Sequence, residues 1–590
     1  MLSSLSALAG DAFQAVEPAL WVAYFIALAP VSSRAVRRIV AAGQLHQLLG
    51  VTALAVAFRL LSPWEPIYWH YPLMNLHLGD ELYTRQNSYL PYVLRVSVFE
   101  LHGGFDAALV FNLIAGTVSI GLLWYTALMA GHPRRVCLLF GALLALIPMY
   151  VRQSASDDVY ITILLLYASA GAAFATLSAG TQRRYGVVLL VTSVLLGMPI
   201  RGESAIVFSS IPLFWLHGSM RLKELLKPKR RNVVLAASLA MGAIVVYHLQ
   251  HASLDERAHL DGTSLLFGLV TQSLCVLSPL FFPPLIAVPI WLMTWHLMRE
   301  RRWRNLLSIH LPIWVGRVPH LFGCAFMLSL ADSGYHILSV IFIVLASARG
   351  LDFLYLRHVQ GRFMTDPRRW RVALWSSAGV FVFWCVSGCS WRGIEGQEMR
   401  FLYSAFPRQP STILVIWDPD PTPGDDCCLS EPYPPLWAEM PRTRWIVLRR
   451  SDLDRPDYIR SLRFDFYFPG SMVQLEDSSN GYTRGGHSSD DEKLQHQAEG
   501  LRELRLLDAL VRQTHQLEPW RTATIHGRTP SFAHFPDDTV ILTVYRNTDA
   551  STSSPTNPGW LSRAFQTGAV AVDPLDDSEP LPGARVPTAP

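Results

Sequence analysis

Charged residues are scarce in this sequence. Asp, Glu, Lys and Arg make up 16% of its 590 residues, whereas an ordinary soluble domain contains about 25%. The mean hydropathy is +0.24 even though the last third of the chain is polar, so the first two thirds must be far more apolar than the average. The net charge of +4 is too small to indicate a nucleic-acid partner. This composition excludes an ordinary soluble protein and indicates a chain embedded in a membrane.

Cysteine pairs with metal-binding spacing are also missing, because none of the seven cysteines forms a CxxC pair. Five of them lie in or beside apolar runs: Cys137, Cys275, Cys324, Cys385 and Cys389. In such runs cysteine is usually a small buried hydrophobe. Cys427 and Cys428 are expected to be free thiols, since a disulfide between adjacent residues is strained. Residues 1–16 contain no basic residue, so we predict a retained first helix rather than a cleaved signal peptide.

Apolar runs long enough to cross a bilayer fill the first two thirds of the chain. A spanning helix needs about 20 apolar residues. The sequence predicts about twelve spans, near residues 17–33, 42–61, 105–129, 136–151, 159–178, 186–200, 203–217, 232–250, 278–298, 306–329, 337–356 and 372–390. We therefore predict a polytopic α-helical membrane domain over residues 1–390, with one long loop at 63–104.

The basic residues between these spans alternate from loop to loop. One set of alternate loops contains 22 Lys and Arg residues, in clusters at 34–38, 134–135, 183–184, 221–231, 299–304 and 357–371. The opposite loops contain five. Because basic loops stay on the cytoplasmic side, we predict a multi-pass protein of the inner or plasma membrane. The 63–104 loop and the chain after residue 390 would then face the periplasm or the extracellular space.

A polar domain is predicted over residues 391–548, followed by a flexible tail at 549–590. Four β-branched and aromatic runs indicate strands at 412–417, 445–448, 464–468 and 540–545. Leucines at helical spacing predict an amphipathic helix over 491–514. The expected fold is α/β or α+β. Its histidines lack metal-ligand spacing and it has no Gly-rich phosphate loop, so we expect an accessory domain that recognises an acceptor or covers the site.

Three groups of ionisable residues fall on the side opposite the basic loops: Asp80-Glu81, Arg152 with Asp157-Asp158, and Arg201-Gly202-Glu203. Each group has a simple structural explanation. The first could be a solvated loop pair, the second a helix N-cap, and the third an ion pair across a turn. Ionisable residues at one membrane face are nevertheless functional candidates by default. Carboxylates can activate a hydroxyl or hold a divalent cation, and arginine suits phosphate.

The order of these motifs resembles the GT-C superfamily of integral-membrane glycosyltransferases, over roughly residues 42–356. The branch most similar comprises the protein O-mannosyltransferases and the lipid A aminoarabinose transferases. Its members have an Asp-Glu pair in a long first outer loop, as in Gly79-Asp80-Glu81-Leu82-Tyr83. They also have a span ending in Pro, then Arg, then Asp, as in the segment from Pro148 to Asp158. The turn Gly197–Glu203 is a looser match, and Ser333-Gly334-Tyr335-His336 lacks the arginine typical of the late outer turn.

The resemblance implies a sugar donor linked to polyprenyl phosphate and an acceptor hydroxyl on a protein, a lipid or a glycan, with membrane lipids around the enzyme. It implies inversion at the anomeric carbon, with Asp80 as general base and Glu81 as the second catalytic acid. Glu81 and Asp158 would also hold a divalent cation such as Mg²⁺ or Mn²⁺. The remaining substrate-binding residues that it implies are Tyr83, Arg152, Asp157, Asp158, Arg201, Glu203, Tyr335 and His336.

Two other classes of protein remain open. A transporter or flippase of a lipid-linked or polar substrate also keeps charges at membrane depth, although within discontinuous helices and internal repeats. No internal duplication is evident here, and the acidic groups lie at the ends of the spans. A scaffold that displays residues 391–548 would leave the acidic clusters without a purpose. Movement of a labelled sugar from polyprenyl phosphate to an acceptor would separate a transferase from both.

Overall fold

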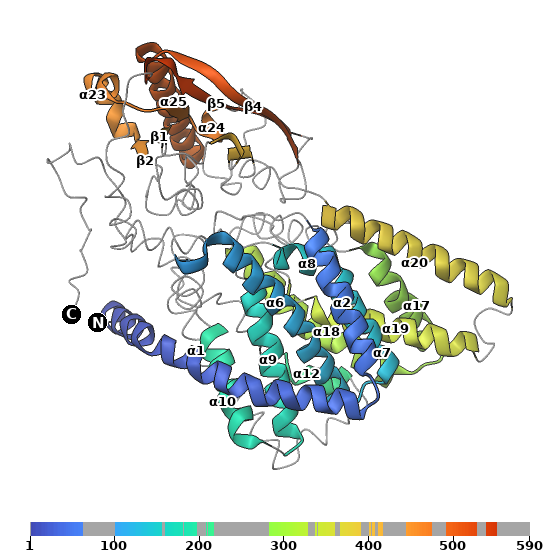
Figure 1. Ribbon diagram of the computed structural model, residues 1–590. Helices are drawn as coiled ribbons and strands as arrows, with labels where there is room; N and C mark the ends of the chain where they lie inside the picture. The colour runs from blue at the N-terminus through green and yellow to red at the C-terminus, as the bar shows by residue number, and fades with distance from the viewer. Residues whose placement is uncertain are drawn as a thin grey trace.

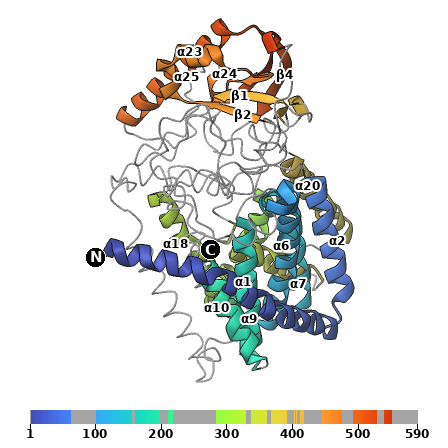
Figure 2. The same cartoon turned by 60° about the vertical axis from the view of Figure 1, so that its left-hand side comes forward.

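The computed structural model describes several parts of the chain. These are residues 2–62, 101–155, 160–180, 182–197, 208, 210–217, 283–327, 337–338, 340–359, 366–390, 401–402, 404–406, 411–416, 444–474, 491–527 and 538–550. Helices α1 to α20 form one bundle, and the strands with α25 form a separate region beyond it (Figures 1 and 2).

The bundle is built from α1 (Leu2–Ala41), α2 (Leu45–Leu61), α6 (Leu101–Met129), α7 (Arg134–Leu146), α8 (Pro148–Ser154), α9 (Tyr160–Ser178), α10 (Arg183–Gly197), α12 (Leu213–His217), η3 (Pro284–Ile286), α17 (Ala287–Arg299), α18 (Trp303–Met327), α19 (Ile341–Val359) and α20 (Pro367–Ser390). Four of these described helices contain segments long and apolar enough to cross a membrane: Ala19–Ala41, Val110–Met129, Tyr160–Ser178 and Arg371–Cys389. The bent pair α7–α8 would make a fifth. The predicted count of twelve spans is not reached within the described residues, and the predicted span 232–250 lies outside them.

Helix α9 occupies the centre of the bundle. Its residues Tyr160–Thr176 are all buried, and a helix that is apolar on every side is stable only when other helices surround it. Two of its polar side chains pair with neighbouring segments. The Tyr24 hydroxyl lies 2.8 Å from Ser169 Oγ and the Tyr167 hydroxyl 3.0 Å from Ser210 Oγ. These bonds fix α1 and the 210–217 segment against α9.

The predicted span 136–151 consists of two helices, α7 and α8, separated by a bend. The chain bends by 57° between α7 and α8, because Pro148 has no N–H to donate and forces the residue before it out of the helical region. Ile147 accordingly has ψ 124°, an extended conformation. All seven residues of α8 are buried, so the bend directs this short helix into the bundle.

One end of the bundle gathers the basic loops, and we call it the basic end. Gln44 Nε2 donates to the carbonyl of Arg134 at 3.1 Å, and the Arg135 guanidinium lies over the Tyr355 ring. Close by in sequence, Arg357 forms an ion pair with Glu300, the C-cap residue of α17. The loops after α1, before α7, after α17 and at the end of α19 therefore meet at one end, as the alternation of charge predicts.

The C-terminal region contains a five-stranded sheet with the order β2-β1-β3-β5-β4. The strands are β1 (Thr412–Ile416), β2 (Arg444–Leu448), β3 (Phe466–Phe468), β4 (Leu517–Gly527) and β5 (Asp538–Asn547). β1 pairs in parallel with β2 and β3, while β5 pairs antiparallel with β3 and β4. The four predicted strands and the predicted helix, α25 (Asp491–Thr514), are confirmed. Sequence analysis missed β4.

The two faces of this sheet have different partners. Leu414 and Ile416 belong to the core beneath α25, whereas Ile413 and Val415 pack on the opposite face. This alternation is the two-residue period of a strand, and burial on both faces explains why β1 is a continuous apolar run. The remaining helical elements here are α23 (Pro456–Ser461), α24 (Ser471–Gln474) and the 3-10 helices η5 (Arg450–Asp454) and η6 (Thr548–Ala550).

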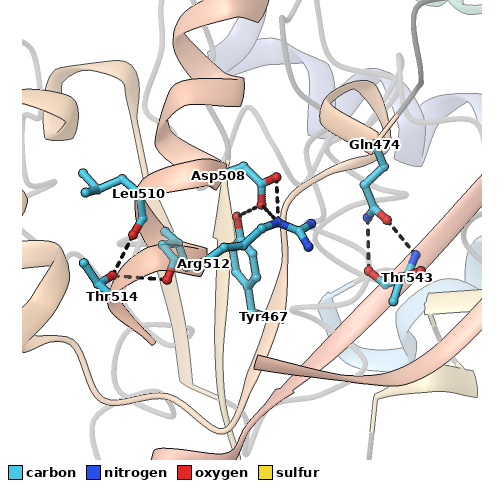
Figure 3. Close-up of polar contacts among 8 residues, drawn as sticks. Tyr467, Gln474, Asp508, Leu510, Arg512, Thr514 and Thr543 are labelled. Carbon is cyan, nitrogen blue, oxygen red and sulfur yellow. Dashed lines mark hydrogen bonds and ion pairs between the residues drawn. The ribbon is translucent and has the colours of Figure 1, made fainter. Parts of the chain in front are cut away.

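A polar network fixes α25 to the sheet (Figure 3). The Tyr467 hydroxyl donates to Asp508 at 2.7 Å, and Arg512 Nε lies 2.8 and 2.9 Å from the two carboxylate oxygens of the same Asp508. Burial raises the pKa of the Tyr467 phenol well above its ordinary value, so the hydroxyl stays a neutral donor. Gln474 and Thr543 exchange two further bonds, at 3.1 and 2.7 Å. These bonds connect α25 to β3 and α24 to β5, so the network stabilises the packing of both helices on the sheet.

A tight helix crossing in the bundle gives the first prediction. A Cβ atom added at Gly350 on α19 would lie 2.6 Å from the Pro289 carbonyl oxygen of α17, and backbone cannot move aside as a side chain can. Gly350→Ala should therefore lower the free energy of unfolding by about 1–3 kcal/mol, the usual cost of overpacking. Thermal unfolding of the purified protein in detergent measures this change.

The matched control is Gly379→Ala on α20, where an added Cβ meets nothing within 4 Å. Alanine is the better helix former, so the control should not lose stability. Equal melting temperatures for the two variants would contradict the close approach of α17 and α19.

Candidate functional site

Helices α2, α6 and α20 lie against α8 at the end of the bundle opposite the basic end. Helix α2 starts beside Arg134 at the basic end and its 17 residues cover about 25 Å, so Ser62 reaches the other end. There Ser62 Oγ donates to the carbonyl of Cys389, near the end of α20, at 3.0 Å. We call this region, defined by Arg59, Ser62, Arg152 and Cys389, the α8 end.

Arg152 is the predicted site residue that the structure describes. It lies on α8 and is 9% exposed. Its helix is held in place by Tyr150, whose hydroxyl donates to the carbonyl of Ile337 at 2.9 Å. Within the helix, the Ser154 hydroxyl donates to the carbonyl of Tyr150 at 2.7 Å. The bend before Pro148 therefore determines where the guanidinium lies. Arg152 is a buried cation, not a solvated loop residue.

A second buried cation at the α8 end escaped sequence analysis. Arg59, in the last turn of α2, is 2% exposed. The buried residues of α2 are Val51, Ala55 and Arg59, each one helical turn apart, so Arg59 continues the face that packs against the bundle. Both Arg59 and Arg152 interact electrostatically with the Cys389 thiol. The available signal was a single basic residue inside an otherwise apolar span, which alone suggests function.

The other predicted site residues lie outside the described residues: Asp80, Glu81, Tyr83, Asp157, Asp158, Arg201, Glu203, Tyr335 and His336. The structure thus neither brings them together nor separates them. Two of these groups adjoin described residues in the sequence. Asp157 and Asp158 follow Ala155, the C-cap of α8, and His336 precedes Ile337, which accepts the bond from Tyr150.

The described side chains at the α8 end suit an anion better than a metal cation. Arg59 and Arg152 are both positively charged, and their neighbours Ser62, Ser154 and Cys389 are neutral in their ordinary state. No group of three His, Cys, Asp or Glu residues within the described part of the chain could hold a metal ion. The predicted cation ligands Glu81 and Asp158 are not among the residues described. The described side chains therefore suit an oxyanion such as a phosphate, a sulfate or a carboxylate.

No protein-family model matches the sequence, and no curated protein is significantly similar to it. Among solved structures, the chain is similar to the apo form of the Archaeoglobus fulgidus oligosaccharyltransferase, with 12% identity and a TM-score of 0.35. It is also similar to a complex of that protein with Zn and sulfate, with 14% identity and a TM-score of 0.36. The matches cover 63% and 62% of this chain, but only 62% and 60% of the other. Similarity at this level establishes neither a shared fold nor a shared activity.

Proposed function

We propose that this protein is a membrane glycosyltransferase that moves a sugar from a polyprenyl-phosphate donor to an acceptor hydroxyl. The observation that carries the proposal is the buried Arg152 on the short helix α8, at the end of the bundle where Arg59 is also buried. Of the two arginines, Arg59 has two buried nitrogen atoms without a hydrogen-bond partner among the described residues, and phosphate is the anion whose geometry a guanidinium matches best. A phosphate attached to a lipid would reach this depth from the bilayer.

The proposed reaction uses the motifs of the sequence together with this cation. The acceptor oxygen attacks the anomeric carbon of the donor while the Asp80 carboxylate takes its proton. The bond from the anomeric carbon to the phosphate oxygen breaks, and its electron pair leaves with the polyprenyl phosphate. Arg152 and Arg201 would stabilise the charge that develops there. Attack from the face opposite the phosphate inverts the configuration of the sugar.

The remaining residues have supporting roles in this proposal. Glu81 would act beside Asp80, and Asp157, Asp158 and Glu203 would bind sugar hydroxyls, with Tyr83, Tyr335 and His336 around them. A divalent cation held by Glu81 and Asp158 would supply further charge stabilisation when bound. The sheet region would recognise the acceptor, which is a protein, a lipid or a glycan.

A transporter or flippase is the second candidate, favoured by the 57° bend between α7 and α8. Transporters form substrate sites at such discontinuous helices. Here, however, α7 has 13 residues and α8 has seven, so the bend lies nearer the α8 end than the middle of the pair. Transfer of sugar by purified protein in detergent would favour the enzyme, because transport requires a sealed membrane.

The role of Asp80 gives the second prediction. Asp80→Asn keeps the size of the side chain but cannot take a proton, and loss of a general base costs about 10²–10⁴-fold in rate. Transfer of radiolabelled sugar from polyprenyl phosphate should therefore fall by about that factor. Binding of the lipid donor should be retained, since the proposed contacts to phosphate are arginines.

Glu81→Gln is the matched comparison, one residue along the chain. It should be less impaired than Asp80→Asn, because its proposed role is to hold a cation or to support the base. Near-normal turnover by Asp80→Asn would contradict the mechanism. It would favour the interpretation of Asp80-Glu81 as a solvated loop pair.

The proposed orientation gives the third prediction. If the basic end is cytoplasmic, a membrane-impermeant thiol reagent should label single cysteines introduced at Ser88, Ser253 and Ser479 in intact cells. It should not label cysteines introduced at Ser33 or Thr181 until the cells are permeabilised. The labelling is measured by the mass shift of the protein, in a background from which the native cysteines have been removed.

Ser33 and Thr181, which we expect on the cytoplasmic side, serve as controls for the three positions that we expect outside. Labelling at Thr181 in intact cells would reverse the orientation, and the α8 end would then face the cytoplasm.

A further inference from the structure

Arg59 is bound to the protein by one of its nitrogen atoms. Nη1 donates to the carbonyl of Ala55 at 3.1 Å, one turn earlier on the same helix. Nε and Nη2 are buried and have no hydrogen-bond partner among the residues that the structure describes. A guanidinium has five N–H donors, and each donor buried without an acceptor costs free energy. The side chain is therefore only partly satisfied by the fold.

Gly116 on α6 packs closely against Arg59 and Ser154. A Cβ atom at this position would lie 2.2 Å from Ser154 Oγ and 3.3 Å from Arg59 Nε. The bare backbone thus allows α2, α6 and α8 to approach one another around the guanidinium. Any larger residue would occupy the space between Arg59 and Ser154.

A second cation lies in the same region of the bundle. Arg152 is two residues before Ser154 on α8, and the Cys389 thiol interacts electrostatically with both arginines. Two buried guanidinium groups near one thiol place positive charge in the same region, and positive charge favours an anion there. Among the residues described, no carboxylate forms an ion pair with Arg59.

We propose that Arg59 binds the phosphate of a lipid, donating from Nε and Nη2, with Arg152 as the second cation. The position of Arg59 in the last turn of an apolar helix favours a lipid phosphate, because a bilayer places a lipid head group at that depth. The anion site stands on the geometry of Arg59, while its place in sugar transfer rests on the proposed function.

Equilibrium binding of ³²P-labelled polyprenyl phosphate to the purified full-length protein tests this proposal. Loss of a charge-assisted contact to phosphate should weaken binding by about ten- to a hundred-fold in Arg59→Gln. Arg59→Lys should recover part of the affinity, since lysine keeps the charge but not the paired donors. Unchanged affinity in Arg59→Gln would overturn the site.

A melting curve separates binding from a structural role. Removing an incompletely paired buried cation should leave the melting temperature unchanged or raise it. A large loss of melting temperature in Arg59→Gln together with unchanged affinity would show that the arginine supports the fold alone.

Two glycines on α6 provide a matched pair of variants. Gly116→Ala places a methyl group between Arg59 and Ser154, so it should weaken binding of the lipid phosphate. Gly121→Ala adds the same group where nothing lies within 4 Å, and its affinity should equal that of the unaltered protein. Should Gly116→Ala fail to fold, the comparison of Arg59→Gln with Arg59→Lys still decides the question.

Competitors distinguish the source of the phosphate. Inorganic phosphate should displace the labelled lipid only at concentrations at least about a hundred-fold higher than unlabelled polyprenyl phosphate does, since it lacks the buried chain. Equal potency would overturn the assignment to a lipid. Because the assay involves no transfer, weakened binding in Arg59→Gln supports the anion site even if Asp80→Asn keeps its turnover and the transferase proposal fails.

Discussion

The burial of a guanidinium group in an apolar helical bundle is the constraint that organises the α8 end of this protein. Arg59 cannot reach solvent, because its helix places it on the buried face with Val51 and Ala55. Its charge must therefore be compensated from within the bundle or by a ligand. The break before Pro148 brings α8 into the bundle, and the missing side chain of Gly116 makes room for it beside Arg59. Residues on α2, α6 and α8 therefore all contribute to the surroundings of the buried Arg59.

Periodicity was sufficient to predict most of the regular structure described in the C-terminal region, because burial repeats with the geometry of each element. The helix over 491–514 and the strands around 412–416 and 444–448 are where apolar spacing places them. Strand β4 was missed because it is the edge of the sheet and carries Pro519, with a register shift between Pro519 and Arg521. An edge strand needs no apolar alternation and tolerates proline, so its sequence resembles a loop.

The candidate site could be predicted less well, since it depends on contacts between distant segments. Arg152 was found because it stands next to a recognisable Pro and two Asp residues. Arg59 was missed because hydropathy averages a single charge into an apolar span, and only the packing of α2 against α6 reveals its burial. Sequence analysis also did not predict the bend at Ile147. Pro148 was the available signal, because proline interrupts a helix. Patterns along the sequence predict helices and strands, but they do not show which side chains on different helices contact each other.

The two ends of the bundle treat arginine differently, and this contrast bears on function. At the basic end, Glu300 accepts from Arg357 and lies 3.0 Å from Arg302 and 3.3 Å from His296. The pair of Arg357 with Glu300 holds α19 to the end of α17, and the partner of this arginine is part of the fold. At the α8 end, Arg59 has a backbone carbonyl and a neutral thiol as its described neighbours. A charge that the fold itself neutralises needs no ligand, whereas a buried charge left to a backbone carbonyl favours one. The same residue type is therefore structural at one end of the helices and suited to binding at the other.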